Sequence, residues 1–136
     1  MGSLATVIDD VIGFHARLCR HGDGLPAAHG LVDPGMMLHI PAEFPWQPVC
    51  ARGAGALREY RDALDVISDR TFEMTTAGHT ADERVVAIRC HESATRNQVR
   101  MDWSSLWIYA LAAGRVTEIT VVHAVPGDQM ADFWCS

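Results

Sequence analysis

Hydrophobic and polar positions in the first half of the chain follow a helical period. Residues 4–18 place apolar side chains, and one histidine, three and four positions apart on a single stripe. Ser3 is the expected N-cap of this helix, and the segment 21–24 ends it. A short helical turn follows at 25–29. A second helix is predicted over residues 53–67, with an apolar face that consists of Leu57, Tyr60, Leu64 and Ile67.

The second half of the chain changes to a period of two, which is typical of strands. The predicted strands cover residues 72–76, 84–92, 99–111 and 115–125, and turn-rich segments separate them at 77–80, 94–97 and 112–114. One earlier strand is predicted over 36–40, after a turn at 33–35 and before a proline-rich loop at 42–49. Helices that precede hairpin-linked strands indicate an α+β protein with a mostly antiparallel sheet. Phe133 and Trp134 predict that the C-terminal tail docks on the fold.

Composition narrows the range of functions. A chain of 136 residues with 49% hydrophobic and 21% charged residues is the size of one globular domain, here 1–136. All eleven basic residues are arginine, which excludes Schiff-base and pyridoxal-phosphate lysines and the Walker lysine. The net charge of −6 argues against nucleic acid and anionic membranes as partners. The absence of a signal-like segment or a long apolar run predicts a cytoplasmic protein.

The cysteines and histidines show no metal-binding pattern. Cys19, Cys50, Cys90 and Cys135 contain no CxxC pair, so free thiols are expected rather than a zinc or thioredoxin-type site. No Gly-rich phosphate loop and no G-x-S-x-G sequence occurs. We therefore expect no metal and no cofactor.

The order of several short segments resembles the nuclear-transport-factor-2-like superfamily, in its SnoaL-like branch of polyketide cyclases and ketosteroid isomerase relatives. The similarity rests on the helix end at 20–25, the strand 38–41, the helix start at 52–60, the hairpin 106–116 and the tail with Asp128, Phe133 and Trp134. The resemblance spans nearly the whole chain. It implies a cone of about three helices against a strongly curved sheet, with one deep apolar pocket.

The same resemblance implies a function. Members are cofactor-free enzymes that cyclise or isomerise hydrophobic biosynthetic intermediates by acid/base chemistry, and they are commonly homodimers through the outer sheet face. A bacterial enzyme of secondary metabolism that acts on a polyketide-like substrate is therefore expected. The rich use of arginine, alanine, glycine and aspartate agrees with a GC-rich bacterial genome.

Two histidines match positions at which the family keeps pocket groups. The interval from Asp23 to His39 is that between the helix end and the catalytic aspartate of ketosteroid isomerase, so the resemblance places His39 at the pocket mouth as the proton-transfer group. His15 matches an oxyanion-binding tyrosine in the same way. A structural, hydrogen-bonded histidine is the alternative at each position.

Other candidates come from the strands. His91 and His123 are further catalytic candidates, because either imidazole could polarise a substrate oxygen. Arg89 and Asp102 are candidate substrate-binding residues, and they carry the alternative of an epoxide hydrolase or dehydratase in the same pocket.

Aromatic residues form the expected cavity wall. Trp103 and Trp107 share one face of a strand with Ser105 and Tyr109, and Tyr60 and Trp46 complete the substrate-binding set. Core packing or a dimer face is the other interpretation of that aromatic strand face, and a one-residue bulge would exchange its two faces. A non-catalytic ligand-binding or dimerisation module is the remaining alternative for the whole protein.

Overall fold

The computed structural model describes residues 4–20, 30–45, 50–125 and 127–135. The predicted N-cap Ser3, the helix end at 21–24, the short turn at 25–29 and the cavity residue Trp46 lie outside the described residues.

Three helices and one open, six-stranded sheet make up the described fold, and their chain order is α1 (Leu4–Leu18), β1 (Val32–His39), β2 (Cys50–Arg52), α2 (Ala54–Ile67), β3 (Glu73–Ala81), β4 (Val85–Arg96), β5 (Val99–Ala112), β6 (Arg115–His123) and α3 (Gly127–Cys135). The strand order is β2-β1-β6-β5-β4-β3. Every neighbouring pair is antiparallel except β1 and β6. The predicted α+β class, with a curved and mostly antiparallel sheet on three helices, is confirmed.

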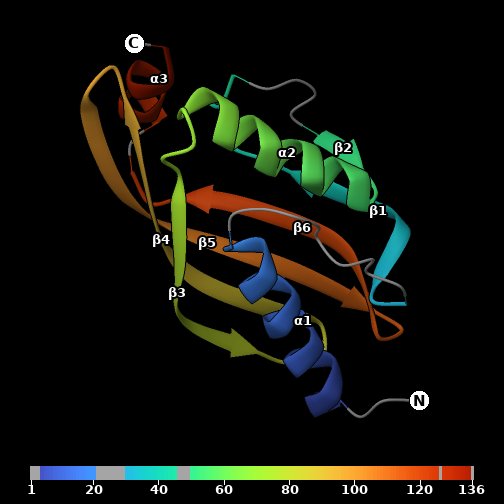
Figure 1. The fold of residues 1–136 in the computed structure, drawn as a ribbon. Helices are drawn as coiled ribbons and strands as arrows, with labels where there is room; N and C mark the ends of the chain where they lie inside the picture. Colours follow the sequence, from blue (N-terminus) through green and yellow to red (C-terminus); the bar gives the residue numbers. More distant parts are fainter. Residues whose placement is uncertain (1–3, 21–29, 46–49, 126, 136) are drawn as a thin grey trace.

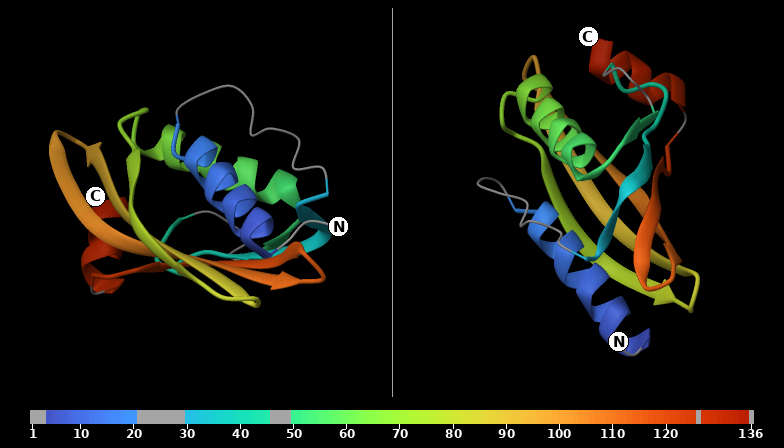
Figure 2. Two further views of the ribbon diagram at one scale, coloured as in Figure 1. Left: turned by 90° about the horizontal axis from the view of Figure 1, so that it is seen from below. Right: turned by 90° about the vertical axis from the view of Figure 1, so that its right-hand side faces the viewer.

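The helices cover one side of this sheet. The sheet curves strongly, and α1 and α2 both lie on its concave side, whereas α3 lies at one end, beside the β4–β5 hairpin (Figures 1 and 2). Apolar side chains of all three helices are buried, including Phe14 of α1, Leu64 of α2 and Trp134 of α3. The core therefore lies between the helices and the concave sheet face.

The C-terminal tail docks as predicted. Phe133 and Trp134 are both buried, and the ring of Trp134 packs edge-on against Phe44 and Trp103 at centroid distances of 5.1 and 5.8 Å. Arg96, at the end of β4, donates a hydrogen bond to the carbonyl oxygen of Trp134. Both contacts fix α3 against the end of the sheet.

Two predicted turns lie inside strands. β3 continues through residues 77–80, because a register shift between Thr76 and Gly78 absorbs the irregular segment without ending the pairing with β4. β1 begins at Val32, and its register with β6 shifts between Val32 and Met37. The predicted turn chemistry at 33–35 is present locally, since the Asp33 carboxylate accepts the Gly35 N–H at 2.9 Å.

The other boundaries differ by a few residues. β4 runs to Arg96 because the hairpin turn falls at Asn97 and Gln98, which both have positive φ angles of 49° and 69°. The three-residue strand β2 was not predicted.

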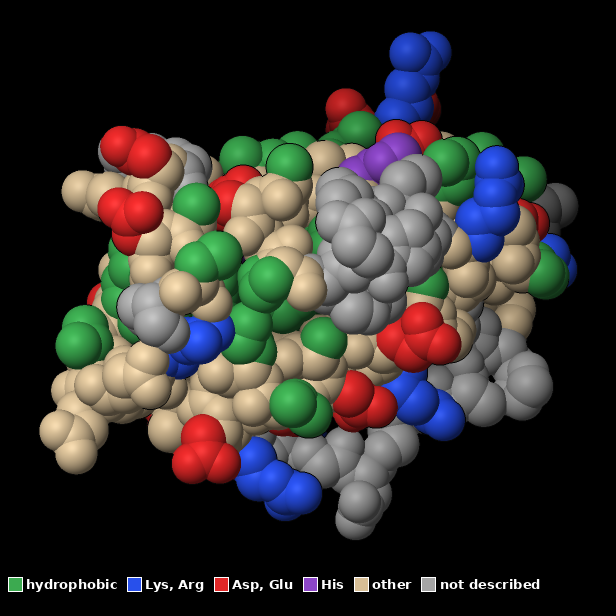
Figure 3. Space-filling model, turned by 90° about the horizontal axis from the view of Figure 1, so that it is seen from above, with side chains coloured by type: hydrophobic (Ala, Val, Ile, Leu, Met, Phe, Trp, Pro, Cys, Tyr) green, Lys and Arg blue, Asp and Glu red, His purple; other side chains and the backbone are tan. Residues whose placement is uncertain are grey.

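On the face drawn in Figure 3, arginine and acidic side chains are interspersed. Among the described helices, none combines the length and apolar character that a membrane crossing requires.

Candidate active site

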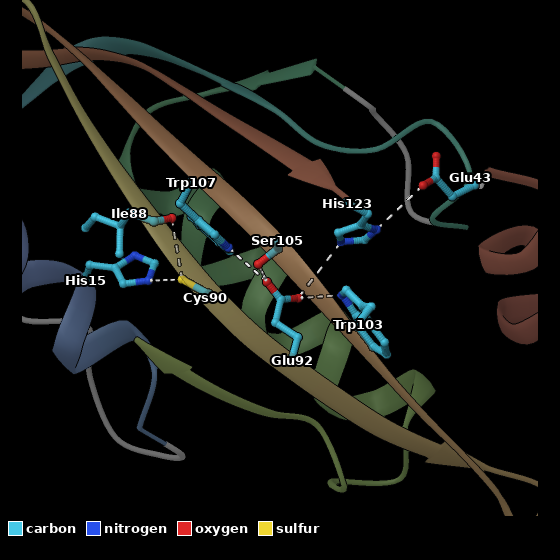
Figure 4. Close-up of polar contacts among 9 residues, drawn as sticks. All are labelled: His15, Glu43, Ile88, Cys90, Glu92, Trp103, Ser105, Trp107 and His123. Atoms are coloured by element: carbon cyan, nitrogen blue, oxygen red, sulfur yellow. Dashed lines mark hydrogen bonds and ion pairs between the residues drawn. The ribbon is translucent and has the colours of Figure 1, made fainter. Parts of the chain in front are cut away.

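Sheet register places a row of polar residues on the concave face. Cys90 of β4 is paired with Ser105 of β5, and Ser105 is paired with His123 of β6. Glu92, two residues after Cys90, also points inward and is opposite Trp103. Because side chains alternate between the two faces of a strand, this register gathers the four polar groups on one wall (Figure 4).

Glu92 is the centre of this wall. Its side chain is 0% exposed, and its two carboxylate oxygens accept three hydrogen bonds from β5. Trp103 Nε1 donates to Oε1 at 3.2 Å, Trp107 Nε1 donates to Oε2 at 3.0 Å, and the Ser105 hydroxyl donates to Oε2. An indole N–H can only donate, so both tryptophans require the acceptor that the carboxylate provides. These bonds compensate the cost of burying the acid.

His123 lies between two carboxylates. Its Nε2 is 3.9 Å from Glu92 Oε1, and its Nδ1 is 3.5 Å from Glu43 Oε1. The His123 side chain is 2% exposed and that of Glu43 is 19% exposed, so Glu43 is the member of this pair nearer to solvent. Neither ring nitrogen of His123 has a hydrogen-bond partner among the described residues. The two carboxylates are therefore the nearest polar partners of this buried imidazole, and neither contact is a short hydrogen bond.

Burial lowers the pKa of His123, while the nearby Glu92 and Glu43 carboxylates act in the opposite direction. The net direction is downward, so the imidazole is neutral near pH 7. A neutral imidazole can accept a proton, and the flanking carboxylates then stabilise the imidazolium that forms. The arrangement of Glu43, His123 and Glu92 is therefore suited to general-base chemistry.

A second polar cluster is attached to α1. His15 is 0% exposed, with Nδ1 at 2.7 Å from the Tyr109 hydroxyl and Nε2 at 3.1 Å from Cys90 Sγ. One proton arrangement satisfies every contact: Tyr109 donates to Nδ1, Nε2–H donates to Cys90, and the thiol donates to the Ile88 carbonyl at 3.8 Å. Burial lowers the pKa of His15 to about 4. His15 is thus a neutral, fully hydrogen-bonded interior residue.

Aromatic rings surround both clusters. Trp107 contacts the rings of His15 and Tyr60, and Trp103 lies 5.7 Å from the His123 ring. Burial, followed by the Glu92 charge, raises the pKa of Tyr60 well above its usual value. The tyrosine hydroxyl therefore stays protonated and can act only as a neutral donor or acceptor.

Comparisons with known proteins establish the fold. No family model matches the sequence, and no curated protein matches it either. Solved structures do match. Bal32a, from a soil-derived mobile gene cassette, superimposes with a TM-score of 0.78 at 18% identity, over 97% of this chain and 99% of that chain. A protein from Jannaschia sp. CCS1, proposed to be a SnoaL-like polyketide cyclase, gives a TM-score of 0.67 at 14% identity, over 90% and 91%. The chain has the SnoaL-like fold.

A third structure with this fold is TerC co-crystallised with polyporic acid, at a TM-score of 0.73 and 10% identity, over 96% of this chain and 98% of that chain. These matches confirm the fold that the sequence resemblance implied. The matches to Bal32a and TerC cover nearly the full length of both chains in each comparison.

Within the SnoaL-like fold, several sequence-predicted residues lie where they were expected. His15 and His123 face the interior from α1 and β6, and Trp103, Trp107 and Tyr60 are buried around them. Trp103 and Trp107 share the inward face of β5, which resolves the question of which face of that strand lines the interior.

Four other candidates lie on the opposite face of the sheet, and their expected position in the interior is wrong. His39 alternates with buried residues of β1, is 35% exposed, and contacts Glu118 at 3.1 Å. His91 is 57% exposed and lies 3.7 Å from Asp102, itself 46% exposed. Arg89 is also exposed. Successive side chains of a strand point to opposite faces of the sheet, and these residues fall on the outward positions.

The outer face has its own groove of about 520 Å³. Arg89 and His91 line it together with Ser104, Leu106 and Val122. Arg89 and Asp102 therefore do not lie in the interior, where the epoxide hydrolase or dehydratase alternative expected them.

Sequence reasoning missed Glu92 and Glu43. A signal for Glu92 was present, because it continues the inward phase of Val86, Ile88 and Cys90 along β4. A carboxylate in the buried phase of a strand requires partners and therefore marks a polar site. Glu43 had no such signal, since it lies in the irregular segment after β1.

The described acidic, histidine and cysteine side chains include no group of three or more that could hold a metal ion.

Proposed function

We propose that the protein is a small-molecule enzyme that cyclises or isomerises a hydrophobic, polyketide-like intermediate by acid/base chemistry that needs no cofactor. The proposal rests on the surroundings of His123. Its imidazole is buried on the concave face of a SnoaL-like fold, has no short hydrogen bond at either ring nitrogen, and lies between two carboxylates.

In the proposed reaction, His123 takes a proton from a carbon next to a substrate carbonyl group, and the C–H electron pair becomes an enolate. In a cyclisation the enolate carbon attacks a second carbonyl carbon of the same molecule. In an isomerisation the substrate also has a carbon–carbon double bond next to the reacting carbon, so a dienolate forms and is protonated at its far (γ) carbon. The imidazolium returns the proton to the product in both cases, so the enzyme ends unchanged.

The surroundings of His123 support this role. Its lowered pKa keeps the free imidazole unprotonated near neutral pH, which is the form that a general base requires. The aromatic rings of Trp103, Trp107 and Tyr60 favour an apolar, flat substrate. The fold shared with the proposed polyketide cyclase from Jannaschia, and with TerC co-crystallised with polyporic acid, supports a small organic ligand.

The direct test is exchange of substrate hydrogen for deuterium. The protein is incubated in D₂O with synthetic aromatic β-diketones, and loss of the C–H signal between the carbonyl groups is followed by proton NMR. This readout detects proton abstraction even when the natural product is unknown. We expect His123→Asn to slow exchange by at least about 10²-fold, the usual contribution of a general base.

The matched control is His79→Asn, which makes the same change at an exposed residue of β3 and should leave exchange unchanged. Exchange at the wild-type rate in His123→Asn would remove His123 from the mechanism. Saturable ligand binding with no exchange in the wild-type protein would favour a non-catalytic binding module instead.

The expected homodimer remains a proposal that rests on the family resemblance. Light scattering after size-exclusion chromatography measures the mass in solution. A mass near 14.9 kDa would show a monomer and contradict it.

A further inference from the structure

The buried carboxylate Glu92 has a fixed orientation, because three donors of one strand hold it. Trp103 and Trp107 donate to opposite oxygens, and Ser105 lies between them on β5. Two of these bonds hold Oε2 and the third holds Oε1. Glu92 is therefore held rigidly, with Oε1 facing His123.

The two oxygens of Glu92 are not equally occupied. Oε2 accepts from both Ser105 and Trp107, whereas Oε1 accepts from Trp103 and has His123 Nε2 at 3.9 Å. A carboxylate offers about four acceptor positions, shared between its two oxygens. Oε1 thus keeps a free acceptor position on the side of His123.

The two carboxylates beside His123 differ in access to water. Glu43 is 19% exposed, so water can satisfy its oxygens, whereas Glu92 is 0% exposed and depends on protein donors. A neutral imidazole has a single N–H to give. Nδ1 has the shorter contact, 3.5 Å to Glu43 against 3.9 Å from Nε2 to Glu92, but water can replace the imidazole N–H as a donor to Glu43 and cannot do so at the fully buried Glu92, which favours the proton on Nε2.

We propose that Glu92 is a positioning residue that holds neutral His123 in the tautomer with the proton on Nε2, so that Nδ1 is the basic atom. Nδ1 then faces the side on which Glu43 approaches solvent, and a substrate proton is taken there. The 3.9 Å separation shortens when the imidazolium forms, as catalytic contacts often do on ligand binding. The catalytic part of this inference rests on the proposed function, whereas the tautomer assignment does not.

The tautomer is measured directly in the unliganded protein. Histidine labelled with ¹⁵N reports which ring nitrogen carries the proton, and His123→Asn identifies the His123 signals by their loss. Above the pKa of His123, we expect the Nε2–H form to exceed the Nδ1–H form by at least about tenfold. A wild-type protein with mostly Nδ1–H at His123 would overturn the assignment without any further variant.

Glu92→Gln removes the charge and keeps the side-chain length. We expect the Nε2–H preference to fall below about threefold, and the pKa of His123 to decrease because the nearby negative charge is lost. Glu92→Asp keeps the charge and should retain the Nε2–H preference. The matched control is Glu118→Gln, which removes the carboxylate beside His39 on the outer face and should change neither quantity. An unchanged tautomer ratio in Glu92→Gln would contradict the proposal.

The exchange reaction separates positioning from general loss of structure. With the wild-type protein active, Glu92→Gln should lower kcat, leave KM unchanged and move the acidic limb of the pH–rate profile to lower pH. A purely structural role would lower the amount of folded enzyme without moving that limb. If the wild-type protein shows the Nε2–H tautomer but abstracts no proton from any β-diketone, the proposed function fails and the positioning of His123 stands.

Discussion

Trp103 and Trp107 donate their indole N–H groups to opposite oxygens of the same buried carboxylate, Glu92. Both tryptophans come from the inward face of β5, and the acid comes from the neighbouring strand β4. One strand pair therefore holds a charged group inside an aromatic core. These tryptophans therefore act as hydrogen-bond donors as well as packing in the core. The pattern of aromatic residues alone does not reveal the donor role.

This relationship predicts a large stability cost for removing the acid. Glu92→Leu leaves two indole N–H groups and the Ser105 hydroxyl without their acceptor, and the free energy of unfolding should fall by about 3 kcal/mol or more. Urea denaturation followed by circular dichroism measures the change. Glu118→Leu is the control, because the half-exposed pair that Glu118 forms with His39 should contribute less than about 1 kcal/mol. Equal effects of the two substitutions would contradict the prediction.

Stability should decrease on acidification because of His15. Its pKa is lowered from 6.5 to about 4 by burial, so the unfolded chain binds more protons between these two pH values. The stabilisation is complete above pH 6.5 and is lost as the pH falls towards 4, by roughly 3 kcal/mol from this residue. His123, whose pKa is also lowered, adds to the same trend.

Urea midpoints at pH 7, 5.5 and 4.5 test this pH dependence. His15→Phe should flatten the dependence, whereas the exposed-residue variant His79→Asn should keep the wild-type slope. Stability that rises from pH 7 to pH 5 would show that the imidazole of His15 is not held neutral.

The thiol of Cys90 should be inert in the folded protein. Burial, followed by the charge of Glu92, raises the pKa of Cys90 to about 12, so almost no thiolate is present at pH 8. Labelling with Ellman's reagent should give the same number of fast-reacting thiols in the wild type and in Cys90→Ser. After denaturation the variant should have one thiol fewer. A fast-reacting thiol that disappears in folded Cys90→Ser would refute the expected protection.

Replacement of His39 should leave catalysis nearly unchanged. The side chain lies on the outer face against Glu118, so His39→Ala should alter the deuterium-exchange rate by less than about threefold, unlike a general base, whose loss costs about 10²-fold or more. The measurement compares the exchange rates of the wild type and of folded His39→Ala at several pH values. If His39→Ala lowered the exchange rate as much as His123→Asn, His39 on β1 would be the proton-transfer residue.

Much of the fold could be predicted from the sequence, because periodicity reports which side of an element is buried. The stripe that contains Val11, Phe14 and His15 identified α1 and placed His15 inside. The alternation around Trp107 identified β5 in the same way. Boundaries were less accurate where a bulge carries a strand through residues that favour turns, as at Gly78 in β3.

The site was harder to predict, because it depends on the register between strands and on which face of the sheet each side chain points to. The interval from Asp23 predicted His39 at the pocket mouth, but its neighbours Leu38 and Ile40 occupy the buried phase of the chain and turn the imidazole outward. His123 is inward because it follows Ile119 and Val121 in phase. The contact between Glu92 and His123 crosses β5 entirely, and no local pattern encodes a contact across an intervening strand.

The bonds from Trp103 and Trp107 to Glu92 also make the tryptophan fluorescence of the protein sensitive to changes at the site. Indole emission depends on the charges and hydrogen bonds near the ring, and these two fluorophores are tied to the carboxylate next to His123. A compound that enters beside His123, or a proton that arrives there, will change their emission spectrum. Ligands for this chain can therefore be screened by its own fluorescence, without a label and before any reaction is known.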